Sequence, residues 1–139
     1  MAVPSLLTWI FNRIAAFGAR SRLQPEAQVQ VTFDDREIVC AWPEGARRTA
    51  RWADLTEVHI VTTSEGPWVP DVFWILFSGG PEASVVYPQG ATGDPALLEA
   101  MQHRLPGFDD EAVIRAMGST DDARFVVWKR APTGARRRS

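Results

Sequence analysis

The sequence predicts an α+β fold: a curved, mostly antiparallel sheet of about six strands, with one amphipathic helix before it and two helices before a last strand. Three observations predict it. Apolar and polar residues alternate repeatedly between residues 28 and 87, helical spacing occurs only near the start and in residues 94–118, and the connections are short. Strands grouped before helices indicate an α+β fold, and short connections favour antiparallel neighbours.

The first 22 residues are predicted to be a separate N-terminal unit, with a helix over residues 5–17. Ser5 can cap its start, and Gly18 ends it. Its large apolar side chains recur at helical spacing, at Leu6, Leu7, Ile10, Phe11, Ile14 and Phe17. No charged residue precedes this apolar run and Arg13 interrupts it, so the pattern differs from that of a signal peptide.

Residues 23–130 are predicted to form one α+β domain. Asp34 and Asp35 mark the turn of a hairpin over residues 28–42. The continuous apolar run from 72 to 77 is typical of a central strand buried on both faces. The remaining strands are expected at 47–51, 58–63, 83–87 and 125–128.

Two helices are predicted before the last strand. The first begins at Asp94 or Pro95 and ends before Pro106, and the second has Asp109 as its cap and ends at Gly118. Residues 131–139 contain three arginines and no apolar pattern, so we expect a disordered basic tail there.

Charge is distributed unevenly along the chain, although the net charge of the 139 residues is only -2. Residues 1–22 carry three arginines and no acid, residues 129–139 carry five basic residues and no acid, and the segment between them carries seven arginines and all seventeen acids. The near-neutral overall charge argues against a specific nucleic-acid binder, because such domains are usually basic. One cysteine excludes an internal disulfide, and with no signal sequence we expect a cytoplasmic protein.

Two segments carry a resemblance: Trp52-Ala-Asp-Leu-Thr-Glu-Val and Leu105-Pro-Gly-Phe-Asp-Asp-Glu-Ala. They resemble uncharacterised small proteobacterial proteins over most of residues 28–130. The hairpin followed by Trp-x-x-Leu-x-x-Val is also similar to bacterial pleckstrin-homology-like domains, although a strand rather than a helix closes this chain. The resemblance implies a PH-like sheet and a binding or scaffolding role, and it names no ligand.

The candidate catalytic residues are few. His59, in a predicted strand, could act as a base with a carboxylate such as Asp71 or Glu57, which would make the protein a small hydrolase. The alternative is a structural histidine, because no nucleophile motif accompanies it. Cys40 is expected to be a buried, inert thiol. The glycines form no phosphate-binding pattern, so no cofactor is expected.

Three acidic pairs are candidate metal ligands: Asp34-Asp35, Asp109-Asp110 and Asp121-Asp122. Paired carboxylates can hold magnesium or calcium. Each pair falls at a predicted turn or helix start, where aspartate makes local hydrogen bonds. We therefore expect no metal site.

A partner-binding surface is expected at the loop that contains Glu65, Trp68 and Asp71, because a proline on each side of Trp68 would hold an exposed aromatic in place. The alternative is that Trp68 folds back onto the core. The other tryptophans, Trp9, Trp42, Trp52, Trp74 and Trp128, are expected in the core or at sheet edges.

Three roles remain open for the N-terminal helix. It could lie on an anionic membrane surface at the periphery of the inner membrane, cover one face of the sheet, or pack against its counterpart in a homodimer. The residues concerned are Leu6, Trp9, Ile10, Arg13 and Phe17.

The leading hypothesis is a non-enzymatic, adaptor or immunity-type domain that binds a protein partner, and the acidic middle of the chain favours a basic one. The alternatives are a peripheral membrane protein and the small hydrolase that uses His59.

Overall fold

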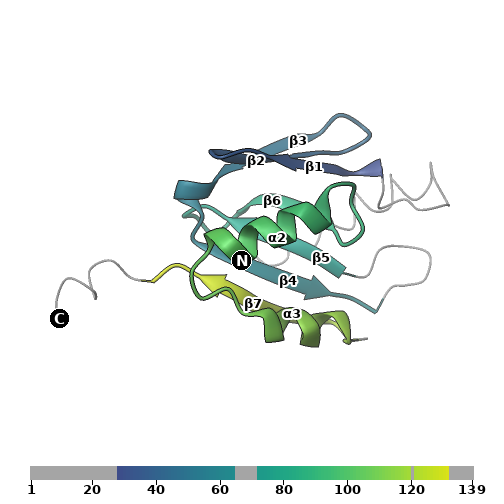
Figure 1. The fold of residues 1–139 in the computed structure, drawn as a ribbon. Helices are drawn as coiled ribbons and strands as arrows, with labels where there is room; N and C mark the ends of the chain where they lie inside the picture. Colours follow the sequence, from purple (N-terminus) through teal and green to yellow (C-terminus); the bar gives the residue numbers. More distant parts are fainter. Residues whose placement is uncertain (1–27, 65–71, 120, 132–139) are drawn as a thin grey trace, which may run out of the picture.

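The computed structural model describes residues 28–64, 72–119 and 121–131, and these form an α+β structure (Figure 1). Its elements follow the predicted order closely: β1 (Gln30–Phe33), β2 (Glu37–Ala41), β3 (Arg47–Arg51), a 3-10 turn at Trp52–Asp54, β4 (Glu57–Thr62), β5 (Val72–Phe77), β6 (Ala83–Pro88), α2 (Asp94–Arg104), α3 (Asp110–Met117) and β7 (Ala123–Lys129). No helix within these residues has the length and apolar character needed to cross a membrane.

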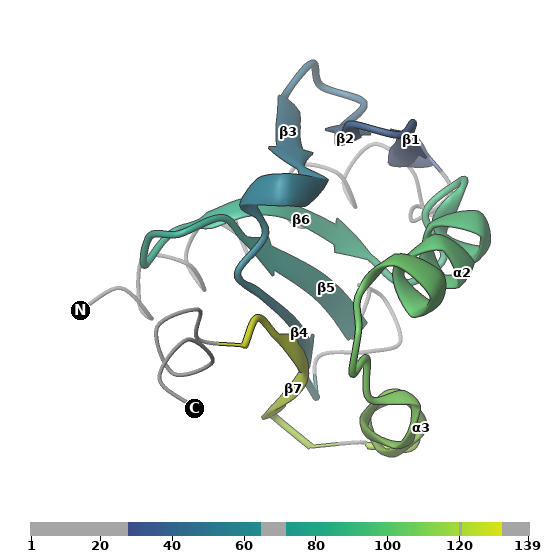
Figure 2. The ribbon, with the colours of Figure 1, turned by 60° about the vertical axis from the view of Figure 1, so that its left-hand side comes forward.

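The strands form two antiparallel sheets, and the prediction of a single sheet was therefore wrong. One sheet has the order β1-β2-β3 and the other has the order β6-β5-β4-β7. The chain leaves β3 through the 3-10 turn, after which β4 pairs with β5 and β7 and not with β3 (Figure 2). The last strand thus joins the four-stranded sheet beside β4, and the described strands do not close into a barrel.

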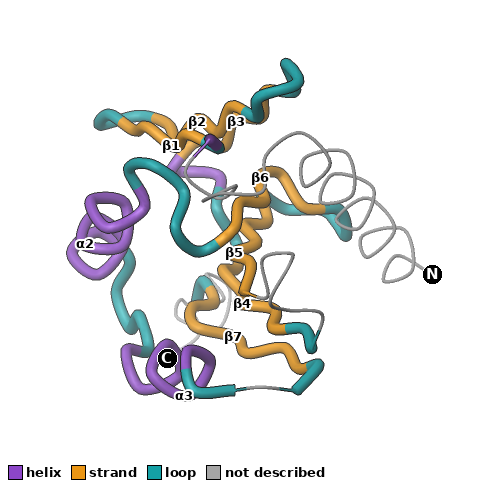
Figure 3. Tube along the Cα trace, turned by 90° about the vertical axis from the view of Figure 1, so that its right-hand side faces the viewer, coloured by secondary structure: helices purple, strands orange, loops and turns teal. Residues whose placement is uncertain are grey.

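The three-stranded sheet lies across the β6 end of the four-stranded sheet, while α2 and α3 lie beside one face of the larger sheet (Figure 3). We call this face the inner face and the opposite one the outer face. One hydrophobic core joins both sheets and both helices, with the largest buried side chains at Trp74, Tyr87, Ile38, Leu97 and Met101. As predicted, β5 is an internal strand, and residues 73–77 are all buried.

Local chemistry fixes where the two helices begin. Gly93, just before α2, has φ +94°, and a Cβ there would lie 2.2 Å from the backbone oxygen of Val31, so only glycine fits against β1. Asp109 caps α3 by accepting a hydrogen bond from the Ala112 amide at 3.0 Å, as the sequence predicted. The fixed start of α2 directs its C-terminal end toward the 3-10 turn (Figure 1).

Several predictions fall on residues that the structure does not describe. The helix over 5–17 and the Trp68 loop lie outside the described residues, as do residues 132–139 of the predicted tail. The PH-like arrangement remains a prediction.

Candidate functional site

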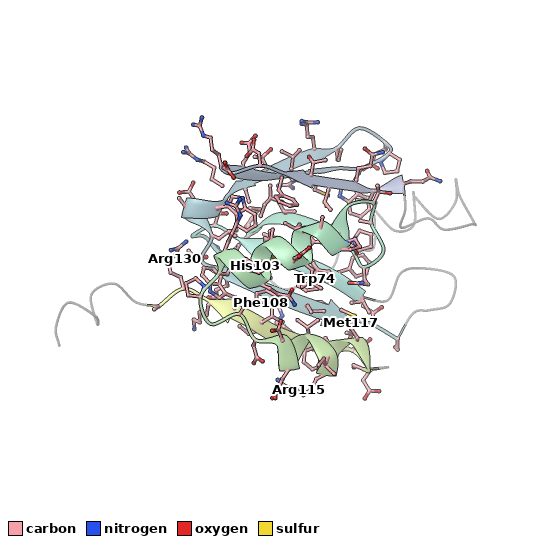
Figure 4. All side chains as sticks on the ribbon, in the orientation of Figure 1. Trp74, His103, Phe108, Arg115, Met117 and Arg130 are labelled. Carbon is pink, nitrogen blue, oxygen red and sulfur yellow. The ribbon has the colours of Figure 1, made fainter. Side chains whose placement is uncertain are left out.

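A cleft of about 540 Å³ opens at the end of the molecule where α2, the 3-10 turn and β7 meet. Figure 4 labels Arg130 at this end. Four segments that are distant in sequence line the cleft: the β1–β2 turn, the end of β3 with the 3-10 turn, the end of α2, and the end of β7. Its charged residues are one aspartate and four arginines, namely Asp35, Arg36, Arg51, Arg104 and Arg130.

Two buried tryptophans form the wall of this cleft. The indole N–H of Trp52 donates to the backbone oxygen of Asp34 at 2.8 Å, and that of Trp128 donates to the backbone oxygen of Pro106 at 2.9 Å. Both indoles are thereby fixed in orientation, since each uses its only polar group. The wall is rigid and its indole donors are already used.

Each tryptophan carries an arginine over its ring. The guanidinium carbon of Arg104 lies 5.0 Å from the centre of the Trp52 ring, and that of Arg130 lies 5.3 Å from the centre of the Trp128 ring. These are cation–π distances. Because the arginines cover these ring faces, the cleft is suited to a charged group rather than to an aromatic ring that stacks on tryptophan.

The four arginines differ in how far their hydrogen-bonding capacity is already used. Arg130 donates to the backbone oxygens of Leu55 at 2.7 Å, Ala53 at 3.3 Å and Trp52 at 3.4 Å, so it holds the 3-10 turn together. Arg104 pairs with the Asp35 carboxylate at 2.9 Å.

Arg36 and Arg51 are both exposed, and neither makes a hydrogen bond or ion pair through its side chain within the described part of the chain. Arg36 lies in the β1–β2 turn and Arg51 is the last residue of β3, and the two segments are joined where the Trp52 amide donates to the Arg36 backbone oxygen at 3.0 Å. Each guanidinium offers five N–H donors to an anion.

Acidic residues border the same arginines. A second hollow of about 330 Å³ is lined by Asp34, Glu37 and the same Arg36 and Arg51. The Asp34 carboxylate accepts the backbone amides of Arg36 and Glu37 at 2.8 and 2.9 Å, and these hydrogen bonds lower its pKa. Asp34 is therefore part of the turn, as the sequence predicted for this pair. The arrangement can bind a carboxylate or a phosphate locally, while its acidic border repels a uniformly negative surface.

His59 lies elsewhere, on the outer face of the four-stranded sheet, in contact with two charged residues. Arg124 donates to its Nδ1 at 3.0 Å, so its Nε2 carries the proton and donates to the Glu57 carboxylate at 2.6 Å. The pKa of His59 is lowered, chiefly by burial, although its hydrogen bond to Glu57 opposes this shift. Both ring nitrogens are occupied, the side chain is only 9% exposed, and neither described hollow reaches it. This geometry is that of a structural network in the sheet.

The sequence-predicted candidates are thus only partly brought together. Glu57 does reach His59, whereas Asp71, Glu65 and Trp68 lie outside the described residues, as do Leu6, Trp9, Ile10, Arg13 and Phe17. The tryptophans that are described were correctly placed in the core or at its edge: Trp42, Trp52, Trp74 and Trp128.

Cys40 is buried, and burial raises the pKa of its thiol to about 12, which fits the predicted inert thiol. Asp122 accepts the Ser64 amide at 2.8 Å, so it joins two segments that are distant in sequence instead of making the local hydrogen bond expected for this pair. In residues 28–64, 72–119 and 121–131, no three His, Cys, Asp or Glu side chains are arranged to hold a metal ion.

The sequence reasoning missed the cleft. Its arginines are spread from residue 36 to residue 130, so no local spacing links them. The available signal was the repeated proximity of arginine and tryptophan, at Arg51-Trp52 and at Trp128-x-Arg130. No protein-family model, curated protein or solved structure matches this chain.

Proposed function

We propose that this protein is a non-enzymatic binding domain whose arginine–tryptophan cleft receives an acidic segment of a partner protein. The observation that carries the proposal is the presence of two exposed arginines, Arg36 and Arg51, whose side-chain donors are unused within the described residues, beside a rigid wall. A bidentate guanidinium–carboxylate contact is the interaction these groups make best.

The charge of the described residues favours a partner that presents a local cluster of acidic side chains. These residues carry nine basic and fourteen acidic side chains, so the described part of the chain is net negative although arginines line the cleft. The arginines would attract a short acidic segment into the cleft. The acidic residues outside the cleft would repel a partner whose whole surface is acidic. The earlier expectation of a basic partner remains a prediction, and it concerns the surface outside the cleft.

Peptide binding tests this function directly. The full chain is titrated with a fluorescent glutamate-rich peptide and, as the control ligand, with a lysine-rich peptide of equal length. We expect the acidic peptide to bind more tightly, with an affinity that falls as salt is raised. Preferred binding of the lysine-rich peptide would favour the basic partner instead.

A double variant tests whether the acidic peptide binds in the cleft. Arg36→Gln with Arg51→Gln should weaken the acidic peptide by about tenfold, or about 1.4 kcal/mol, because hydrogen bonds to charged groups contribute this much. The matched control is Arg47→Gln with Arg115→Gln, which removes the same charge at exposed arginines outside the cleft. Equal losses in both variants would mean that only net charge matters, and the cleft would not be the site.

A further inference from the structure

β3 lies at one edge of the three-stranded sheet and pairs there with β2 alone. We call the side of β3 that faces away from β2 its free edge. Figure 2 shows β2 and β1 on one side of β3 and no described strand or helix on the other. Every residue of β3 except Ala50 is exposed. A segment that approached the free edge would therefore meet none of the described elements.

The pairing with β2 determines which backbone groups of β3 point to the free edge. Directly after β3, the Trp52 amide donates to the Arg36 backbone oxygen at 3.0 Å. Hydrogen-bonded pairs alternate along an antiparallel ladder, so Ala50 and Arg48 also bond to β2. The N–H and C=O groups of the intervening residues point to the free edge. These residues are Arg47, Thr49 and Arg51, and within residues 28–64, 72–119 and 121–131 none of these groups has a hydrogen-bond partner.

The other three edge strands each have a backbone group engaged at their outer side. On β1, the Val31 amide donates at 2.9 Å to a backbone oxygen of the loop before α2. On β7, the Val127 oxygen accepts the Asp109 amide at 2.7 Å, and on β6 the Val86 oxygen accepts the Trp42 indole N–H at 3.3 Å. β3 has no such contact in the described part of the chain, so its edge can pair with an added strand.

The charge of β3 favours an acidic strand over a second copy of this chain. Its sequence is Arg-Arg-Thr-Ala-Arg, with three arginines and no acid. Two copies of β3 that paired antiparallel about Thr49 would place Arg47 opposite Arg51, and like charges in opposite positions destabilise a sheet. An acidic segment meets no such repulsion. Arg51 also lines the cleft, so the free edge leads directly into it.

We propose that the acidic partner segment binds as an extended strand antiparallel to β3, with acidic residues at its N-terminal end in the cleft. This inference rests on the proposed function and specifies how the same ligand binds. β3 runs from Arg47 toward the cleft, so an antiparallel strand begins there. The strand pairs within both sheets are all antiparallel, and such ladders are slightly more stable than parallel ones.

Two kinds of contact would divide the recognition between them. Backbone hydrogen bonds along the free edge supply affinity without regard to sequence, and the arginines at the cleft select the acidic end. Arg47, at the opposite end of β3, lies outside the cleft and would face the part of the segment that follows the acids. The partner is therefore expected to present acidic residues followed by residues that favour an extended strand.

Amide hydrogen exchange in the full chain provides the test. The probe is a peptide of three glutamates followed by five threonines, with both ends blocked. With the peptide at about ten times its dissociation constant, exchange should slow about tenfold at the amides of Arg47, Thr49 and Arg51, because only unbound chain exchanges there. The amides of Arg48 and Ala50 are internal controls. They already bond to β2 and should exchange slowly with or without peptide.

The outcomes separate this inference from the proposed function. If the peptide shifts the indole signals of Trp52 and Trp128 but exchange at Thr49 stays fast, the added strand is overturned and binding in the cleft stands. If neither this peptide nor the glutamate-rich peptide binds, both proposals fail. Tighter binding of the reversed peptide, five threonines followed by three glutamates, would overturn the antiparallel direction.

The free chain must also show an open edge. Slow exchange at Arg47, Thr49 and Arg51 without peptide would overturn the proposal, because the edge would already be occupied. A second copy would be the occupant if the protection grew with the concentration of the chain, and the chain itself if it did not.

A pair of substitutions at Thr49 gives a second measurement. Thr49→Pro removes an N–H that makes no bond to β2, and proline is tolerated at such edge positions. The residue before proline favours an extended conformation, which Arg48 already has. Thr49→Pro should weaken peptide binding about fivefold, whereas Thr49→Val, which keeps the N–H, should change it less than about twofold. Equal affinities of the two variants would overturn the added strand.

Discussion

The arginine–tryptophan cleft and the network of His59, Glu57 and Arg124 both contain charged side chains, yet they differ in how many hydrogen-bonding groups remain available to a ligand. At His59 both ring nitrogens are hydrogen-bonded and neither described hollow reaches the ring. At the cleft, two of four arginines have unused donors beside about 540 Å³ of open space. A shifted pKa distinguishes His59, whereas unused hydrogen-bond donors beside open space distinguish the cleft. A shifted pKa alone therefore does not identify a binding site.

The largest effect should come from Arg130, whose donors hold the 3-10 turn. Arg130→Ala should lower the free energy of unfolding by about 2 kcal/mol, because three backbone oxygens lose a charged donor. Chemical denaturation measures this loss. Lys129→Ala is the neighbouring control and should change stability by less than about 0.5 kcal/mol. If Arg130→Ala proved equally mild, the division between structural and ligand-binding arginines would be wrong.

Arg104 should give an intermediate result, since it is partly exposed and already paired with the almost fully exposed Asp35. Exposed ion pairs contribute at most about 1 kcal/mol. Arg104→Gln should therefore cost less than Arg130→Ala in stability and less than the Arg36/Arg51 double variant in peptide affinity. Parallel denaturation and peptide titration measure both quantities. A larger affinity loss at Arg104 would move the centre of the site from the β1–β2 turn and the end of β3 to the end of α2.

The smallest effect is expected at His59, as a change of pH dependence. Burial lowers its pKa in the folded state below the ordinary 6.5, so the unfolded state binds the proton more readily. This contribution to stability is present above pH 6.5 and is lost as the pH falls below it. His59→Gln should flatten the dependence, measured as unfolding free energy between pH 8 and pH 5. An unchanged slope would show that His59 is not buried as a neutral ring.

Local patterns were sufficient to predict most elements. The alternation at Val29 and Val31, the apolar run in β5 and the cap at Asp109 all depend on neighbouring residues, and the structure confirms each. The division into two sheets was not predictable in this way, because it depends on which strand β4 pairs with after the 3-10 turn. Strand pairing is decided by packing between distant segments.

The difference between local patterns and contacts of distant segments also explains which candidate site the sequence could reveal. Glu57 and His59 are two residues apart on one strand and so share a face, which the sequence alone could show. Arg36, Arg51 and Arg104 meet only because Gly93 anchors α2 on β1 and because the 3-10 turn redirects the chain. A cleft assembled from four segments has no periodicity that could reveal it.

Binding of an acidic segment in the cleft between Trp52 and Trp128 can be followed at the indole N–H signals of the tryptophans. The glutamate-rich peptide is titrated into isotope-labelled full chain. We expect the signals of Trp52 and Trp128 to shift, while those of Trp42 and Trp74, which do not line the cleft, stay in place. Shifts confined to Trp42 and Trp74, or binding that moves neither cleft tryptophan, would contradict it.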